Sequence, residues 1–205
     1  GPRATTPIIA PQVPKRTAMA PSNEQNGVAN RILLALPQAT LERIRPALRP
    51  VNTTRSQVIA RITEPIEHMY FVNRGLVSLI KTMRDGRTVE IGAVGIEGVT
   101  DPHALFGIEK APFDSIIQIA GTALRIQRGS LQTEVAKDDT FREIMQDYAR
   151  FTFRQLAQTA ACNRLHSLEE RCCRWLLIAH DSTLSDTFSL TQEFRQHAMA
   201  LEQSV

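Results

Sequence analysis

The chain has 205 residues, of which 42 % are hydrophobic and 22 % charged, and its formal net charge is +3. This length suits one globular domain with room for a second small one, and the composition excludes a disordered chain or a collagen-like repeat. The longest purely apolar runs, such as Ile32–Leu36, are too short to cross a bilayer. The three cysteines lack metal-ligand spacing, so we expect no metal, no cofactor and a reducing, cytoplasmic setting.

Residues 1–27 are predicted to be a disordered leader. Five of the eleven prolines lie within the first 21 residues, among Thr, Ala, Gln and basic side chains. Such a segment cannot bury enough apolar surface to order itself, and it lacks the apolar stretch of a signal peptide.

Residues 28–137 are predicted to form a short helical stretch followed by an antiparallel sheet that wraps on itself. The helical pattern is interrupted by Pro37, and from Val51 onward apolar residues alternate with polar ones. Asn73-Arg74-Gly75 and Asp85-Gly86 are typical of turns between strands. We expect strands near 56–62, 67–73, 76–83, 87–93, 115–120 and 122–127, without helical crossovers.

Residues 138–166 are predicted to form one long helix that begins at a capping box, Thr140-x-x-Glu143. Its apolar and small polar residues recur at alternating spacings of four and three: Phe141, Met145, Tyr148, Thr152 and Gln155. Such a seam can pair two helices, or it can pack on the chain's own sheet, and the pattern leaves both interpretations open.

A second capping box, Ser167-x-x-Glu170, predicts another helix, with a joint between the two helices at Ala160–Asn163. Adjacent residues on a helix point about 100° apart, so Cys172 and Cys173 cannot converge on one metal ion. We expect Cys172 in the core and Cys173 partly exposed. His180-Asp181 lacks the motif context of a hydrolase, so no catalytic residue is predicted.

Three stretches carry a resemblance to a known family. They are Tyr70–Ser78 followed by Asp85-Gly86-Arg87, then Val94–Gly98, and then His166–Arg171 continuing through Trp175–Leu177. In this order they make the sequence similar to the Crp/Fnr family of bacterial transcription regulators over about residues 30–194.

The resemblance implies an α+β fold and a non-enzymatic regulator. Residues 28–137 would be the sensory domain, an antiparallel double-stranded β-roll of the cyclic-nucleotide-binding jelly-roll type. Residues 138–166 would be a dimerisation helix, and residues 167–205 a hinge helix with a partial, winged-helix-like DNA-reading region. The implied partners are a second copy of the chain, DNA and a small-molecule effector, with no membrane.

In members of this family that bind cyclic nucleotides, a cassette of backbone amides and one arginine holds the cyclic phosphate. Gly95, Glu97 and Gly98 match part of that cassette, whereas Asp114, followed by Ser115, stands on or near the arginine position. A carboxylate 4 Å from a phosphate is repelled by roughly 4 kcal/mol at an effective dielectric of about 20. We therefore expect an unidentified effector rather than cyclic AMP, bound beside Gly95–Gly98.

The DNA-reading end departs most from the family. Thr191–Met199 matches the first helix of a helix-turn-helix, but Glu202 stands where the family usually carries arginine. The 24 residues from Ser182 to Val205 are fewer than two helices and a wing require. An incomplete or divergent reader is therefore predicted, and the alternative is a dimerising protein-interaction module that does not bind DNA by itself. The candidate DNA contacts are Thr191, Gln192, Gln203 and Ser204.

Overall fold

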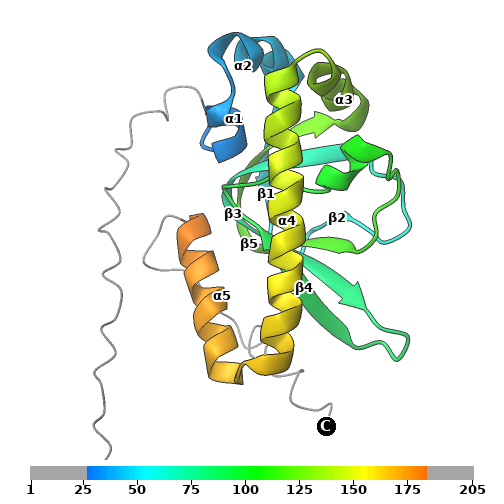
Figure 1. Cartoon of the computed structure of the whole chain (residues 1–205), viewed down its shortest axis with the longest axis vertical. Coiled ribbons are helices and arrows are strands. Elements are labelled where there is room, and N and C mark those ends of the chain that lie inside the picture. The colour runs from blue at the N-terminus through cyan, green and yellow to red at the C-terminus, as the bar shows by residue number, and fades with distance from the viewer. Residues whose placement is uncertain (1–26, 184–205) are drawn as a thin grey trace, which may run out of the picture.

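The structure is a computed structural model, and it describes residues 27–183 as an antiparallel sheet followed by long helices, an α+β fold (Figure 1). The predicted leader lies outside the described residues except for Gly27. The predicted helix from Thr191, the candidate DNA contacts and the whole segment 184–205 also lie outside them.

One five-stranded antiparallel sheet forms the roll. Its strands are β1 (Arg49–Thr53), β2 (Val58–Ala60), β3 (His68–Thr82), β4 (Thr88–Val94) and β5 (Asp114–Gln127). The order is β1-β5-β3-β4, and the short β2 pairs with the other end of β5. The predicted antiparallel roll is confirmed, because every pairing is antiparallel and no helix crosses over between strands.

The strand boundaries differ from the prediction in two ways. The expected pairs 67–73 with 76–83, and 115–120 with 122–127, are each a single long strand, β3 and β5. The expected strand 56–62 shrinks to β2, and β1 was not predicted at all. Only one residue of β1, Thr53, is buried. The strand therefore lacks the alternation of apolar and polar residues by which a strand is recognised in a sequence.

Asn73-Arg74-Gly75 is a kink within β3 rather than a turn. The pairing with β5 shifts register around Arg74, which is typical of β-bulges. Gly75 has φ +99°, and a Cβ atom there would lie 2.5 Å from the Ile119 carbonyl oxygen. Across the pair, a Cβ atom on Gly121 would lie 2.0 Å from the Arg74 carbonyl oxygen. The two glycines let both long strands bend at one place, which curls the sheet into a roll.

The Asp85-Gly86 hairpin turn is confirmed. Gly86 has φ +84°, and the Met83 amide donates to the Arg87 carbonyl at 2.7 Å to close the hairpin between β3 and β4. The Asp85 carboxylate also accepts from the Arg87 amide at 3.0 Å.

Short helices cover one end of the roll. They are α1 (Arg31–Ala35), α2 (Gln38–Ile44), the 3₁₀ turn η2 (Arg45–Ala47) and α3 (Arg128–Ala136), while a second 3₁₀ turn, η3 (Pro102–Phe106), lies between β4 and β5. The predicted interruption at Pro37 is confirmed, because it separates α1 from α2.

Two long helices complete the chain, α4 (Asp139–Leu165) and α5 (Leu168–Thr183). In Figure 1, α4 runs across the roll and α5, in orange, returns beside it. The predicted joint at Ala160–Asn163 is wrong, since α4 continues unbroken to Leu165 and the chain turns at His166–Ser167. The predicted capping box of α5 is confirmed: Ser167 Oγ accepts from the Glu170 amide, and the Glu170 carboxylate accepts from the Ser167 amide.

Three groups of buried side chains hold these layers together. The largest joins α1, α2, α3 and the first half of α4 to one end of β3 and β5, with Phe71 and Phe141 at its centre. A second fills the inside of the roll around Leu79 and Ile117. The third places Trp175 and Ala179 of α5 against Leu76, Ala93 and Ile119 of the sheet. Each fully buried apolar side chain contributes roughly 1.5–3 kcal/mol to stability.

Within residues 27–183, no helix combines the length and apolar character that a membrane span requires.

The cap of α4 differs from the predicted capping box. Asp138, not Thr140, is the N-cap residue, and its carboxylate accepts from the Thr40 hydroxyl, the Phe141 amide and the Arg43 guanidinium. These bonds, that of Thr40 foremost, lower the pKa of Asp138 to about 2. A carboxylate whose pKa falls on folding stabilises the fold above its unfolded pKa and loses that effect as the pH drops.

We predict that Asp138→Asn lowers the melting temperature at neutral pH, and that its deficit relative to wild type shrinks as the pH falls from about 4 to about 2. Thermal unfolding followed by circular dichroism at several pH values measures this. Asp139→Asn, which removes the same charge from an exposed neighbour, is the control and should show a smaller deficit. A deficit of Asp138→Asn that is constant across this pH range would contradict the cap.

Candidate functional site

The Gly95–Gly98 turn, which directly follows β4, contains three of the predicted site residues. The Gly98 amide donates to the Gly95 carbonyl at 3.0 Å, which closes the turn. The Glu97 carboxylate folds back and accepts from the Gly95 amide, also at 3.0 Å. The structure thus brings Gly95, Glu97 and Gly98 together, but the amides of both glycines already have acceptors within the turn.

The carbonyl groups of this turn anchor the first ordered helix. The Asn30 side-chain amide donates to the Gly98 carbonyl at 2.7 Å and to the Val72 carbonyl at 2.8 Å. The Arg31 amide donates to the Ile96 carbonyl at 2.8 Å. Asn30 is fully buried and also caps α1, so it ties the helix, the turn and β3 into one unit.

Side chains of α4 and α5 approach the two glycines closely. A Cβ atom on Gly98 would lie 2.0 Å from the Tyr148 hydroxyl oxygen, and one on Gly95 would lie 2.2 Å from the Ser182 hydroxyl oxygen. Both distances are far shorter than any van der Waals contact, so any larger residue would force the helices away. The space that these glycines leave is occupied by the chain's own hydroxyl groups.

The environment of the turn disfavours negative charge. Burial, together with the nearby Glu97 carboxylate, raises the pKa of Tyr148 above its ordinary value of 10.0. A tyrosine that stays neutral beside a carboxylate offers no positive charge to an anionic ligand.

Asp114 and Ser115 lie at the start of β5. The Asp114 carboxylate accepts from the Ile62 amide at 2.8 Å, so it is engaged with the loop that follows β2. Ser115 is fully buried, and its hydroxyl has no hydrogen-bond partner within residues 27–183. The structure therefore shows a structural role for the Asp114 carboxylate and leaves the Ser115 hydroxyl free inside the roll.

Asp101 and His103 were not predicted as site residues. Asp101 is only 2 % exposed and adopts a left-handed conformation with φ +53°. Its Oδ1 atom lies 3.8 Å from His103 Nε2, and within the described part of the chain neither atom has a hydrogen-bond partner. Burial raises the pKa of Asp101 to about 6 and lowers that of His103. The only signal for these residues in the sequence is Asp101 immediately before Pro102, an arrangement typical of the start of a helical turn.

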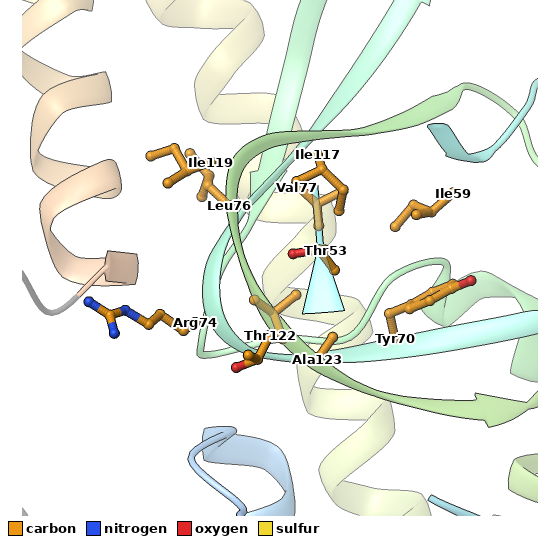
Figure 2. A pocket seen from close by; sticks show the side chains of 11 residues that line it. Thr53, Ile59, Tyr70, Arg74, Leu76, Val77, Ile117, Ile119, Thr122 and Ala123 are labelled. Atoms are coloured by element: carbon orange, nitrogen blue, oxygen red, sulfur yellow. The ribbon is translucent and has the colours of Figure 1, made fainter. Parts of the chain in front are cut away.

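One hollow, inside the roll, is too small for a nucleotide. It has a volume of about 10 Å³, which is room for about one water molecule. Figure 2 shows Val77, Ile117 and Thr53 close together in its wall, while Leu76 and Ile119 lie on the other side of the strands and the Arg74 side chain extends away. Ile59 and Tyr70 also line a second, wider hollow of about 320 Å³, which borders the loop after β2 and carries Arg61 and two glutamates.

The predicted dimer seam packs mainly on the chain's own roll. Phe141 and Met145 are fully buried and Tyr148 is 7 % exposed, all within the largest group of core side chains. Within this one chain these three side chains pack on its own roll, and they leave little surface for a second copy. Thr152 and Gln155 are half-buried. A Cβ atom placed on Gly92 of β4 would lie 3.4 Å from Gln155 Oε1.

The comparisons with known proteins agree with this architecture. Residues 50–138 match the family model described as "Cyclic nucleotide-binding domain". Among proteins of curated function, none matches the sequence.

Two solved structures share the fold. CLP of Xanthomonas campestris, described as a c-di-GMP responsive global regulator, aligns with TM-score 0.60 and 15 % identity over 82 % of this chain and 92 % of that one. FixK2 of Bradyrhizobium japonicum aligns with TM-score 0.57 and 18 % identity over 65 % of this chain and 66 % of that one. Residues 50–138 are thus similar to cyclic nucleotide-binding domains, and the resemblance to Crp/Fnr-type regulators is confirmed at the level of the fold.

We predict that cyclic AMP does not bind with micromolar affinity, because the Glu97 and Asp101 carboxylates act on Tyr148 beside the turn, the Gly95 and Gly98 amides already have acceptors, and the Asp114 carboxylate stands on or near the position of the family's phosphate-binding arginine. Isothermal titration calorimetry of the full chain with cyclic AMP measures this. A saturable heat with a micromolar dissociation constant would show that the turn opens and that the prediction is wrong.

Proposed function

We propose that this chain is a cytoplasmic, non-enzymatic transcription regulator of the Crp/Fnr type, which responds to an effector other than cyclic AMP. The observation that carries the proposal is the path of α4, which crosses the whole roll and ends in a two-residue connection, His166–Ser167, before α5 begins. A rigid helix that packs on the sensory roll at one end and leads to a joint at the other can transmit a change in the roll.

The joint is suited to this role. The His166 amide donates to the Cys162 carbonyl and ends α4, while its own backbone is extended, with φ −96° and ψ 147°. Ser167 and Glu170 then start α5 with a reciprocal cap. Since both helices have their own end caps, they can change their relative angle at one or two backbone dihedrals without losing helical hydrogen bonds.

A second copy would contact the outward face of α4, since the inward face is used by the roll. Phe153 is 75 % exposed, and it shares a face with Ala157 and Ala160 at spacings of four and three. A large apolar residue followed by two small ones allows two helices to approach closely along this line. We therefore place the homodimer contact on Phe153, Ala157 and Ala160 rather than on the buried residues of the predicted seam.

The dimer prediction compares two exposed apolar residues. Phe153→Asp should convert the protein from dimer to monomer at tens of micromolar, because a charge would have to be buried in the pair of helices. Met83→Asp, at the 53 % exposed tip of the β3–β4 hairpin, is the matched control and should leave the dimer intact. Analytical ultracentrifugation measures both. A wild-type protein that sediments as a monomer would refute the proposed dimer.

DNA is the proposed partner of the C-terminal end, through Thr191, Gln192, Gln203 and Ser204. We expect sequence-selective binding to genomic fragments, measured by fluorescence anisotropy at two salt concentrations with and without effector candidates. Because the related CLP is described as c-di-GMP responsive, c-di-GMP is the first candidate to test. A Thr191→Ala/Gln192→Ala variant should bind more weakly at both salt concentrations.

The competing hypothesis predicts a different outcome of the same experiment. A dimerising module that does not bind DNA by itself would show only weak association that disappears at the higher salt concentration, because such binding rests on phosphate charge alone. Glu202, which stands where the family usually has an arginine, favours this hypothesis.

A further inference from the structure

The wider hollow, at the start of β3, lies next to a row of side chains that crosses three strands. Tyr70, which lines the hollow, is paired with Arg125 of β5, and Arg125 is paired in turn with Arg49 of β1. Paired residues of antiparallel strands point to the same face of the sheet, with Cβ atoms about 5 Å apart. The row therefore places two arginines on the same face as the Tyr70 ring.

This row points away from the largest group of core side chains. Phe71 of β3 and its partner Leu124 of β5 are buried in that group, together with residues of the short helices. Because successive residues of a strand alternate between the two faces of a sheet, Tyr70 and Arg125 point to the opposite face. Both residues are half-buried, so they belong to the wall of the roll rather than to its freely exposed surface.

The two arginines of the row have no counter-charge. Elsewhere in the structure an arginine is paired with a carboxylate, as Arg43 is with Glu134 at 2.7 Å. Within residues 27–183, by contrast, neither Arg49 nor Arg125 makes a side-chain hydrogen bond or an ion pair. Like charges directly opposite each other on neighbouring strands destabilise a sheet. An anion with more than one negative charge, bound between the two guanidinium groups, would turn this repulsion into attraction.

The hollow beside the row offers both space and apolar surface. Its volume of about 320 Å³ lies at the lower end of the range for small-molecule sites. Ile59 and Tyr70 contribute apolar surface, and Arg61 adds a third positive charge. The glutamates of the hollow, Glu64 and Glu67, are exposed on the loop, so the anionic group of a ligand is most favourably placed at the sheet, by the arginine row.

The loop that forms the outer wall of the hollow is held in place by backbone hydrogen bonds to residues 109–111. The Thr63 amide donates to the Ala111 carbonyl at 2.8 Å, and the Ile66 amide donates to the Glu109 carbonyl at 2.9 Å. In return, the Ala111 amide donates to the Glu64 carbonyl at 3.0 Å. A wall that is fixed before binding lowers the entropic cost of binding a ligand.

We propose that Arg49 and Arg125 bind the phosphate group of a small organic phosphate, whose apolar or aromatic body lies in the wider hollow against Tyr70. A phosphomonoester carries nearly two negative charges at neutral pH, and its oxygen atoms accept charge-assisted hydrogen bonds from guanidinium groups. Two unpaired arginines match that charge. The Gly95–Gly98 turn and Asp114 do not line this hollow, so the site is separate from them, and it does not depend on whether the protein binds DNA.

Isothermal titration calorimetry of the full chain with phenyl phosphate tests the proposal, because this probe joins a phosphate dianion to one aromatic ring. We expect saturable binding to wild type. Arg49→Gln and Arg125→Gln should each weaken it by about tenfold or more, as the loss of a charge-assisted hydrogen bond does. Arg87→Gln is the control, because it removes the same charge from the exposed β3–β4 hairpin, and it should bind as wild type does.

Inorganic phosphate separates the two halves of the site. Wild type should bind it more weakly than phenyl phosphate, and Tyr70→Leu should weaken the binding of phenyl phosphate while leaving that of inorganic phosphate unchanged. Thermal unfolding checks that each variant is folded, and Arg49, which is exposed, can be replaced even if Arg125→Gln does not fold.

Three results would overturn the proposal. The first is that millimolar phenyl phosphate does not bind to wild type. The second is that folded Arg49→Gln binds it as tightly as wild type does. The third is that Arg87→Gln loses as much affinity as Arg49→Gln, since binding would then follow the net charge of the protein rather than the arginine row.

Discussion

The packing of one face of α4 on the roll determines what the rest of the molecule can do. Phe141, Met145 and Tyr148 are buried together with side chains from the strands and the short helices, so this half of α4 is part of the domain core. Burial of side chains of this size is worth several kcal/mol in sum, which makes the helix inseparable from the roll. Any partner must therefore use the opposite face, and any motion must occur beyond the point where this burial ends.

The glycine turn after β4 illustrates how one backbone feature can serve two purposes. A turn with two glycines near a helix can cradle an anion, because its amides are accessible and no side chain blocks the approach. Here the turn's amides are satisfied internally, and the Tyr148 and Ser182 hydroxyls come closest to its glycines. In this structure the turn is therefore a surface on which α4 and α5 pack.

Features that depend on local interactions could be predicted from the sequence. The Asp85-Gly86 hairpin and the Ser167–Glu170 cap each need only a few adjacent residues, and both are present. The bend at Gly75 looked like a turn because a bulge and a turn use the same residue types, and only the pairing with β5 distinguishes them. Likewise, the heptad spacing of residues on α4 does not show whether they pack on the chain's own roll or against a second copy of the helix. The burial of Asp101 and His103 close to each other depends on the packing around them, which no local pattern encodes.

Ionisation of Tyr148 tests most directly whether α4 is locked onto the glycine turn. The protein has two tyrosines, so a Tyr70→Phe variant leaves Tyr148 as the only phenol to follow by ultraviolet absorbance during an alkaline titration. With its hydroxyl buried against Gly98 and near the Glu97 carboxylate, Tyr148 should stay protonated until the protein unfolds, because its pKa is raised. Reversible ionisation near pH 10 in the folded protein would show that Tyr148 is exposed to water and that α4 does not pack on the turn.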